Sequence, residues 1–272
     1  MLKATYHDGN QTRTAQYLFD TQKLSTGLII ADGVIYGLGT CTDTVLYINL
    51  PVADNAFQEL HSIVEVYMGP GVTFIGESAF AGCKRLSYVE FPNTLTRIGD
   101  SAFIDNMKLE SVNIPGSVKD IGIAAFAFCE SLKSVIIQDG VLSIGQHAFM
   151  ENPALIEISL PASITSMGVA TFARCPKLTK VYLADGLTVL GKTTFGDCNS
   201  LNSLHLPSSI TTMERNLFRN ATSLTELYFD GTMAQWKRIN KDKEWNRESS
   251  LVVVHCVDGD VDPQDEEANG IK

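Results

Sequence analysis

The chain has 272 residues, of which 44% are hydrophobic and 19% charged, so it has ample material for a folded core. Its formal net charge is −10, and six acids against one lysine in residues 258–272 supply about half of that excess. Clustered Lys and Arg, which nucleic-acid binding requires, are missing, and no apolar window reaches the roughly 18 residues of a membrane span. Nucleic-acid binding and membrane insertion are therefore not expected.

The first 56 residues do not follow the regular period described below, and we expect them to form an N-terminal cap. The stretch ATYHDGNQTRTAQYLF predicts a β-hairpin with its turn at His7–Asn10. The following IADGVIYGLGTCTDTVLYINLP predicts an irregular first coil. The start lacks the apolar region of a signal peptide. Three explanations stay open: the protein stays inside the cell, leaves by another route, or has lost a leader.

A ladder of phenylalanines follows, and each step along it is 23 residues. Self-similarity at such a period is typical of a solenoid, in which each unit packs only on its neighbours. We therefore expect seven 23-residue units over residues 57–229. The ladder consists of Phe57, Phe80, Phe103, Phe126, Phe149, Phe172, Phe195 and Phe218.

Each column of the repeat has a physical interpretation. The segment LxxVxF ends in alternating residues, which predicts a short strand with Val89 inward and Tyr88 outward. Stacked strands of this kind make a parallel sheet, and the proline that often follows stops each strand. The pair Ile98-Gly99, repeated in later units, predicts a second short extended piece whose glycine has a positive φ. The Ala-Phe-x-x-Cys/Asn-x-x-Leu stretch predicts a single helical or 3₁₀ turn.

Cysteines recur three positions after the phenylalanines, where asparagine takes their place in other units. We expect a buried column in which Asn bonds turn backbone and Cys fills space, with free thiols. Two coils separate Cys83 from Cys129, about 10 Å, which is beyond disulfide reach. The column contains Cys83, Asn106, Cys129, Asn152, Cys175 and Cys198.

Residues 230–257 change character and predict a C-terminal cap made of a short helix and a strand. Met233, Trp236 and Ile239 lie on one face of the expected helix, and LVVVHC is the expected strand. Trp236 and Trp245 are expected to cover the open end of the apolar stack. Residues 258–272 are expected to be a solvated acidic tail. Weak calcium binding by Asp258, Asp260 and Asp262 stays open, although Pro263 replaces the glycine of a calcium loop.

The string AFxxC/NxxLxxVxIPxxVxxIG resembles the BspA-like leucine-rich repeats over about residues 57–229. The resemblance implies a right-handed solenoid of short parallel strands. It also implies a surface or secreted address and binding to host proteins or to other cells. The expected fold is thus a leucine-rich repeat solenoid with short helical or 3₁₀ turns and irregular caps at both ends. The chain shows neither a signal peptide nor a wall-anchor motif.

The sequence shows no arrangement typical of catalysis, and we expect neither an enzyme nor a cofactor. The five histidines occupy different columns, no Gly-x-Ser-x-Gly elbow is present, and no phosphate-binding lysine motif exists.

The remaining candidate is the outward side of the strand sheet, where both ends carry tyrosines beside charges. The best candidate for partner binding is a C-terminal cluster, and an N-terminal group is the second. The C-terminal cluster consists of Lys180, Tyr182, His205, Glu226 and Tyr228, and the N-terminal group of Tyr67, Tyr88 and Glu90.

The favoured hypothesis is a non-catalytic interaction module that binds a protein, or a glycan, through its strand face. Adhesion in particular is implied by the resemblance alone. The alternative is a structural or assembly subunit, within an intracellular complex or a phage particle, that has no ligand of its own.

Overall fold

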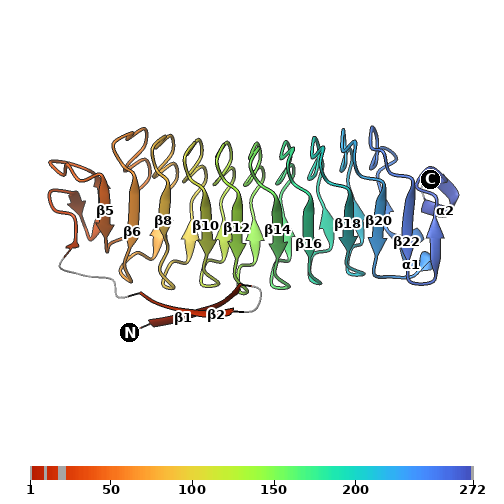
Figure 1. Ribbon diagram of the computed structural model, residues 1–272, viewed down its shortest axis with the longest axis horizontal. Helices are drawn as coiled ribbons and strands as arrows, with labels where there is room; N and C mark the ends of the chain where they lie inside the picture. Colours follow the sequence, from red (N-terminus) through yellow and green to blue (C-terminus); the bar gives the residue numbers. More distant parts are fainter. Residues whose placement is uncertain (1, 9–10, 18–22, 271–272) are drawn as a thin grey trace.

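The computed structural model describes residues 2–8, 11–17 and 23–270. The chain winds into a parallel β-solenoid, with one main strand per turn lying side by side along the long axis (Figure 1). These strands form a three-stranded sheet, β5-β6-β8, and an eight-stranded sheet that begins at β10 and ends at β23.

Each main strand is three or four residues long and alternates between buried and outward positions, as the LxxVxF pattern predicts. In β8, for example, Val89 is buried whereas Tyr88 and Glu90 are half-buried on the outer side. The parallel register pairs equivalent positions of neighbouring units, such as Ser111 with Ser134. The main strands are β5 (Val45–Ile48), β6 (Glu65–Met68), β8 (Tyr88–Glu90), β10 (Ser111–Ile114), β12 (Ser134–Ile137), β14 (Glu157–Leu160), β16 (Lys180–Leu183), β18 (Ser203–Leu206), β20 (Glu226–Phe229) and β22 (Val253–Cys256).

A second set of two-residue strands forms another parallel face, which confirms the extended piece predicted around Ile98. These strands make two ladders, β15-β13-β11-β9-β7 and β17-β19-β21. They are β7 (Phe74–Ile75), β9 (Arg97–Ile98), β11 (Asp120–Ile121), β13 (Ser143–Ile144), β15 (Ser166–Met167), β17 (Val189–Leu190), β19 (Thr212–Met213) and β21 (Asn240–Lys241).

The glycine that follows most of these short strands is required for a different reason from the one predicted. Gly99, Gly122 and Gly145 do not have positive φ angles. Instead, a Cβ added at Gly122 would lie 2.4 Å from the carbonyl carbon of Gly99, and one at Gly145 would lie 2.6 Å from that of Gly122. The glycines are needed because the backbones of adjacent coils approach too closely for any side chain.

The segment around each ladder phenylalanine is a run of turns. Every second backbone N–H donates a hydrogen bond to the carbonyl three residues earlier, as Ala81 does to Ser78. This is the hydrogen-bond spacing of a 3₁₀ turn. The backbone N–H groups between them donate hydrogen bonds to carbonyls of the next coil, as Phe80 does to Ala102 at 2.8 Å. Left-handed residues two positions before and after the phenylalanine, such as Ser101 (φ 52°) and Asp105 (φ 58°), keep these turns from continuing into a helix.

The phenylalanine ladder forms the core. All eight rings are fully buried. Successive rings are stacked with centroids 5.0–6.0 Å apart and interplanar angles of 1–23°. The repeat period therefore places one aromatic ring from every coil in a continuous column.

The cysteine and asparagine column has one structural role in both of its forms. Cys129 Sγ donates to the Phe103 carbonyl at 3.3 Å, and Asn152 Nδ2 donates to the Phe126 carbonyl at 3.0 Å. Each side chain thus satisfies the phenylalanine carbonyl of the preceding coil. The described cysteines are all free, as expected. Burial raises the pKa of the Cys83, Cys129 and Cys175 thiols to about 12, which favours their protonated form at neutral pH.

The N-terminal region contains two antiparallel pairs. β1 (Leu2–Asp8) pairs with β2 (Gln11–Tyr17), which confirms the predicted strand pairing, while part of its turn lies outside the described residues. β3 (Ile29–Ala31) pairs with β4 (Val34–Gly37). Single parallel bridges from Ile35 to Val52 and from Val52 to Ile75 join this region to the second face.

The C-terminal cap closes the ladder with both tryptophans, which are fully buried. Helix α1 (Met233–Arg238) starts with a capping box between Thr232 and Gln235. Trp245 lies edge-on to Phe218 at 6.1 Å between centroids, and Trp236 lies edge-on to Trp245 at 5.7 Å. The tryptophans therefore end the ring column, as predicted.

The acidic segment is folded rather than a solvated tail. β23 (Gly259–Val261) pairs antiparallel with β22, and helix α2 (Glu266–Asn269) follows. The Asn269 side chain is fully buried, and its Oδ1 accepts from Trp236 Nε1 at 2.8 Å. The prediction was wrong here because it considered only charge density, whereas a buried indole N–H requires an acceptor.

No helix within the described ranges is long and apolar enough to cross a membrane.

Candidate interaction surface

The strand face, defined here as the outward side of the main strands β5 to β22, brings the predicted residues into two straight columns. The register pairs Tyr182 with His205, and His205 with Tyr228, so these side chains lie on neighbouring coils. Apart from histidine, the charged residues in the two columns are four glutamates and one lysine, Lys180. The face is therefore acidic. The first column contains Glu65, Tyr88, Ser111, Ser134, Glu157, Lys180, Ser203 and Glu226, and the second Tyr67, Glu90, Asn113, Ile136, Ser159, Tyr182, His205 and Tyr228.

A stack of three rings is the centre of the C-terminal cluster. The His205 and Tyr228 rings are parallel within 10°, with centroids 4.7 Å apart. His255 on β22 continues the stack, 4.9 Å from Tyr228. The Tyr228 hydroxyl donates to Glu226 Oε2 at 2.6 Å, and this hydrogen bond raises the pKa of Tyr228. The phenol therefore remains protonated and fixed on its carboxylate.

The other two members of the C-terminal cluster lie beside this stack. Tyr182 is on the next coil and is 52% exposed, although its register partner is His205. Lys180 shares a column with Glu226, but Ser203 lies between them. Within residues 23–270 Lys180 forms no ion pair with any carboxylate. Tyr182 and Lys180 thus present free contact area rather than contacts within the cluster.

The N-terminal group has a related arrangement. The Tyr67 hydroxyl donates to Glu65 Oε2 at 2.8 Å, and this bond raises the pKa of Tyr67 to about 12. On the next strand the order is reversed, and Tyr88 hydrogen-bonds Glu90. The Tyr67 and Tyr88 rings are 5.4 Å apart and tilted by 46°. Tyrosines and carboxylates therefore alternate across two coils.

Sequence reasoning missed a residue at each end of the face. Tyr47 on β5 stacks on Tyr67 with centroids 5.0 Å apart, and His255 extends the C-terminal stack. Asp260, from the acidic segment, lies 2.8 Å from His255 Nδ1. The signal was present, because VLYI and VVHC have the same alternation as the repeats. Both segments lie outside the 23-residue period, so they did not enter the alignment.

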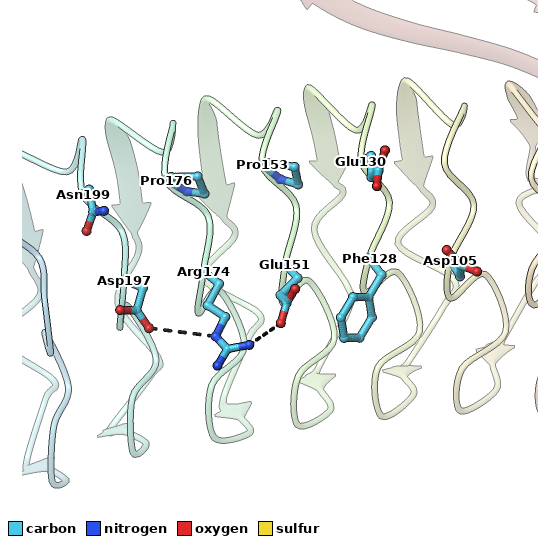
Figure 2. Close-up of a pocket in the computed structure, with 9 residues that line it drawn as sticks. All are labelled: Asp105, Phe128, Glu130, Glu151, Pro153, Arg174, Pro176, Asp197 and Asn199. Carbon is cyan, nitrogen blue, oxygen red and sulfur yellow. Dashed lines mark hydrogen bonds and ion pairs between the residues drawn. The ribbon is translucent and has the colours of Figure 1, made fainter.

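A separate row of residues runs along the turns, two positions after each ladder phenylalanine (Figure 2). Arg174 lies between Glu151 and Asp197 and forms ion pairs with both. The Arg174 side chain is largely exposed and the two carboxylates are partly exposed, and such surface pairs typically contribute only about 0–1 kcal/mol. Phe128 is the exception in this row, an exposed aromatic with φ 60°. We interpret the row as a ladder of coil-to-coil contacts.

The described part of the chain holds no group of three or more His, Cys, Asp or Glu side chains that could bind a metal ion. Asp258, Asp260 and Asp262, the residues considered for calcium, have separate local roles. Asp258 Oδ1 accepts from the Met233 amide at the start of α1 at 2.7 Å, whereas Asp262 Oδ1 accepts from the Gln264 amide. Asp260 pairs with His255.

Several solved bacterial proteins are similar to this chain. A leucine-rich cell surface protein of Faecalibacterium prausnitzii shows 17% identity over 88% of this chain and 98% of its own, with a TM-score of 0.40. A leucine-rich repeat protein of T. pallidum shows 24% identity over 76% and 80%, with a TM-score of 0.42. The pneumococcal vaccine antigen PcpA shows 15% identity over 94% and 88%, with a TM-score of 0.41.

No protein of curated function matches the sequence. The family model for the BspA-type leucine-rich repeat region matches residues 51–175 and 122–240, which together span well over half of the chain. The repeat columns, the stacked coils and this match agree, and the chain belongs to the BspA-type leucine-rich repeat family.

Proposed function

We propose that the chain is a non-catalytic protein-interaction module that binds a cell-surface or host protein through the C-terminal cluster of its strand face. The observation that carries this proposal is the ring stack of His205, Tyr228 and His255, which lies beside the exposed Tyr182. The core requires none of these side chains. They are large, outward and concentrated at one end of the face.

The chemistry of the cluster suits a protein surface. Tyrosine combines a large contact area with a polar tip, and aromatic residues are over-represented among the residues that dominate binding energy. Glu226 fixes the Tyr228 hydroxyl, and neighbouring rings hold Tyr228 on both sides. Little side-chain entropy is then lost on binding, which favours affinity.

A protein partner fits this cluster better than a glycan does. The rings of His205, Tyr228 and His255 are 4.7–4.9 Å apart and cover one another's faces. His205 is exposed and Tyr228 and His255 are half-buried, and side chains of this kind suit the mixed polar and apolar contacts of a protein interface. For a sugar that packs flat against a ring, the most exposed tyrosine ring of this cluster is Tyr182, at 52%.

The proposal includes a location at the cell surface or outside the cell, and the family to which the chain belongs supports this location. Protease accessibility of the native protein on intact cells tests this address. Degradation by added protease without lysis is expected. Complete protection until lysis would contradict a surface location.

The site is tested by replacing Tyr182, His205 and Tyr228 with alanine together and measuring capture of surface proteins from cell extracts. A matched control replaces Ser166, Val189 and Thr212 with alanine, because these residues take outward positions on the short strands of nearby coils. We expect the first triple variant to lose at least tenfold in affinity for a captured partner. The control triple is expected to retain wild-type affinity.

Two outcomes would contradict the proposal. If the wild-type chain captures no protein, the structural-subunit hypothesis becomes the better account. If the Tyr182, His205 and Tyr228 variant captures every partner as the wild type does, the site lies elsewhere. Repeating the capture from an enzymatically deglycosylated extract separates a protein ligand, whose capture persists, from a glycan ligand, whose capture is lost.

A further inference from the structure

The strand face is interrupted between β8 and β10. The three-stranded sheet ends at β8 and the eight-stranded sheet begins at β10, with no ladder between them. Pro115 follows β10 at the position where Gln138 follows β12. The backbone N–H of Gln138 donates to the Ile114 carbonyl oxygen at 3.0 Å. Proline has no N–H, so the equivalent bond to the Phe91 carbonyl cannot form.

Proline shortens the ladder elsewhere in the repeats as well. Four residue pairs join β10 to β12, where Gln138 follows β12, and four join β14 to β16, where Ala184 follows β16. Three pairs join β12 to β14, and a single pair joins β16 to β18, where Pro161 and Pro207 follow. The interruption at Pro115 is the most complete case, although proline is not the only cause of a short ladder, since β20 and β22 also share three pairs with Val257 following β22.

A groove of about 220 Å³ opens at this interruption. Its apolar side includes Ile136, which is 49% exposed, and Phe91, which is turned edge-on to Phe103 with ring centroids 5.6 Å apart. Phe91 is half-buried, whereas Ile114 and Ile137, at the same position of the next two coils, are buried. The lining thus combines accessible apolar surface with the polar ends of two strands.

Glu90 is the one charged residue that lines the groove. Its carboxylate is half-buried, and burial raises its pKa. Its described hydrogen-bond partner is the neutral Tyr88, and within residues 23–270 no Lys, Arg or His nitrogen forms an ion pair with it. A partly desolvated carboxylate without a cation gains most from a ligand that supplies one.

We propose that this groove binds a basic side chain of a partner peptide, with the cation on Glu90 and the flanking apolar residues against Phe91 and Ile136. The inference rests on the proposed function and adds the chemistry of the partner. Charge complementarity identifies the occupant, since the groove contains one anion, no cation and an apolar wall. A guanidinium suits the site best because it can bond a carboxylate through two parallel N–H groups.

The test uses two blocked tripeptides, acetyl-Leu-Arg-Leu-amide and the neutral isostere acetyl-Leu-citrulline-Leu-amide, titrated into the full chain at low salt. Binding is followed by amide chemical shifts in heteronuclear NMR. The arginine peptide should shift amides of residues 88–94 and 111–115 and bind about tenfold more tightly than the citrulline peptide, as a charge-assisted bond predicts. Glu90→Gln should remove this preference while retaining the shape of the groove.

Two further variants complete the experiment. Glu157→Gln removes a carboxylate from the same face outside the groove and should retain the tenfold preference. Ile136→Ser should weaken both peptides alike, because it removes apolar contact but no charge. The inference is overturned if neither peptide shifts these amides, if both peptides bind the wild type equally, or if Glu157→Gln loses as much preference as Glu90→Gln.

Failure of this inference and failure of the proposed function are distinguishable. If the Tyr182, His205 and Tyr228 variant loses its partner but Glu90→Gln keeps the arginine preference, only the groove assignment fails. If Glu90→Gln loses the preference while the triple variant keeps its partner, the groove stands and the C-terminal site fails.

Discussion

The interior of the solenoid and its strand face are built on the same 23-residue period but use it in opposite ways. Inside, every 23-residue repeat contributes a phenylalanine to one continuous stack, and Cys or Asn donates to the same type of carbonyl. Outside, neighbouring coils present tyrosine, serine, isoleucine or glutamate at equivalent positions. A uniform column specifies how the coils stack, and the positions that vary are the ones available for recognition.

The largest effect should come from breaking the phenylalanine stack. Phe126→Ala should lower the free energy of unfolding by about 3–5 kcal/mol, since it removes a fully buried ring from between two stacked neighbours. Thermal and denaturant unfolding measure the loss. Phe128, two residues later, is the matched control because it is 38% exposed with φ 60°. Phe128→Asn should change stability by no more than about 0.5 kcal/mol or increase it, because Asn tolerates left-handed φ. Equal losses in the two variants would contradict the stack.

The Cys and Asn column sharpens the comparison further. Asn152 Nδ2 donates to two buried carbonyls, those of Phe126 and Phe149, and its Oδ1 accepts from the Cys129 amide at 2.9 Å. Asn152→Ala should cost about 1–3 kcal/mol because these buried groups lose their partner. Asn152→Cys should cost less, since cysteine supplies the carbonyl bond in neighbouring coils. Chemical denaturation ranks the two variants, and a cysteine variant as unstable as the alanine variant would refute the equivalence.

The smallest effect concerns reactivity rather than stability. With a pKa of about 12, the Cys83, Cys129 and Cys175 thiols are ionised to about one part in ten thousand at pH 8. Burial raises the pKa of the half-buried Cys256 only to about 11, so Cys256 should react with a disulfide reagent in the native protein before the buried column, which should react only on unfolding. Reaction time courses with and without denaturant follow this order. Fast native labelling of Cys129 would show that the interior opens.

Local sequence patterns predicted the repeat well because each coil has the same kinds of residue at the same positions. The inward Val89 and outward Tyr88 follow from alternation, and the buried Cys129 follows from its place in a column. Gly122 was assigned to the right position for the wrong reason, because the distance between adjacent coils appears only in three dimensions. Asn269 was missed for a similar reason, since its partner, Trp236, is 33 residues away.

The strand face shows the same limit. The columns themselves could be written down from the period, but the ring stack of Tyr228 with His255 needed the cap strand to pair in register. Pro115 was predicted to stop its own strand. That the sheet is also interrupted between β8 and β10 is a relation between neighbouring coils, which no local pattern contains.

The most direct test of the account measures stability and binding on the same two variants. Phe126→Ala should lower the melting temperature and yet bind the captured partner with wild-type affinity at a temperature where it is folded. The Tyr182, His205 and Tyr228 triple alanine variant should melt close to the wild type and lose at least tenfold in affinity. If the triple variant binds as tightly as the wild type, or if affinity follows stability in both variants, recognition is not separate from the scaffold and the account is wrong.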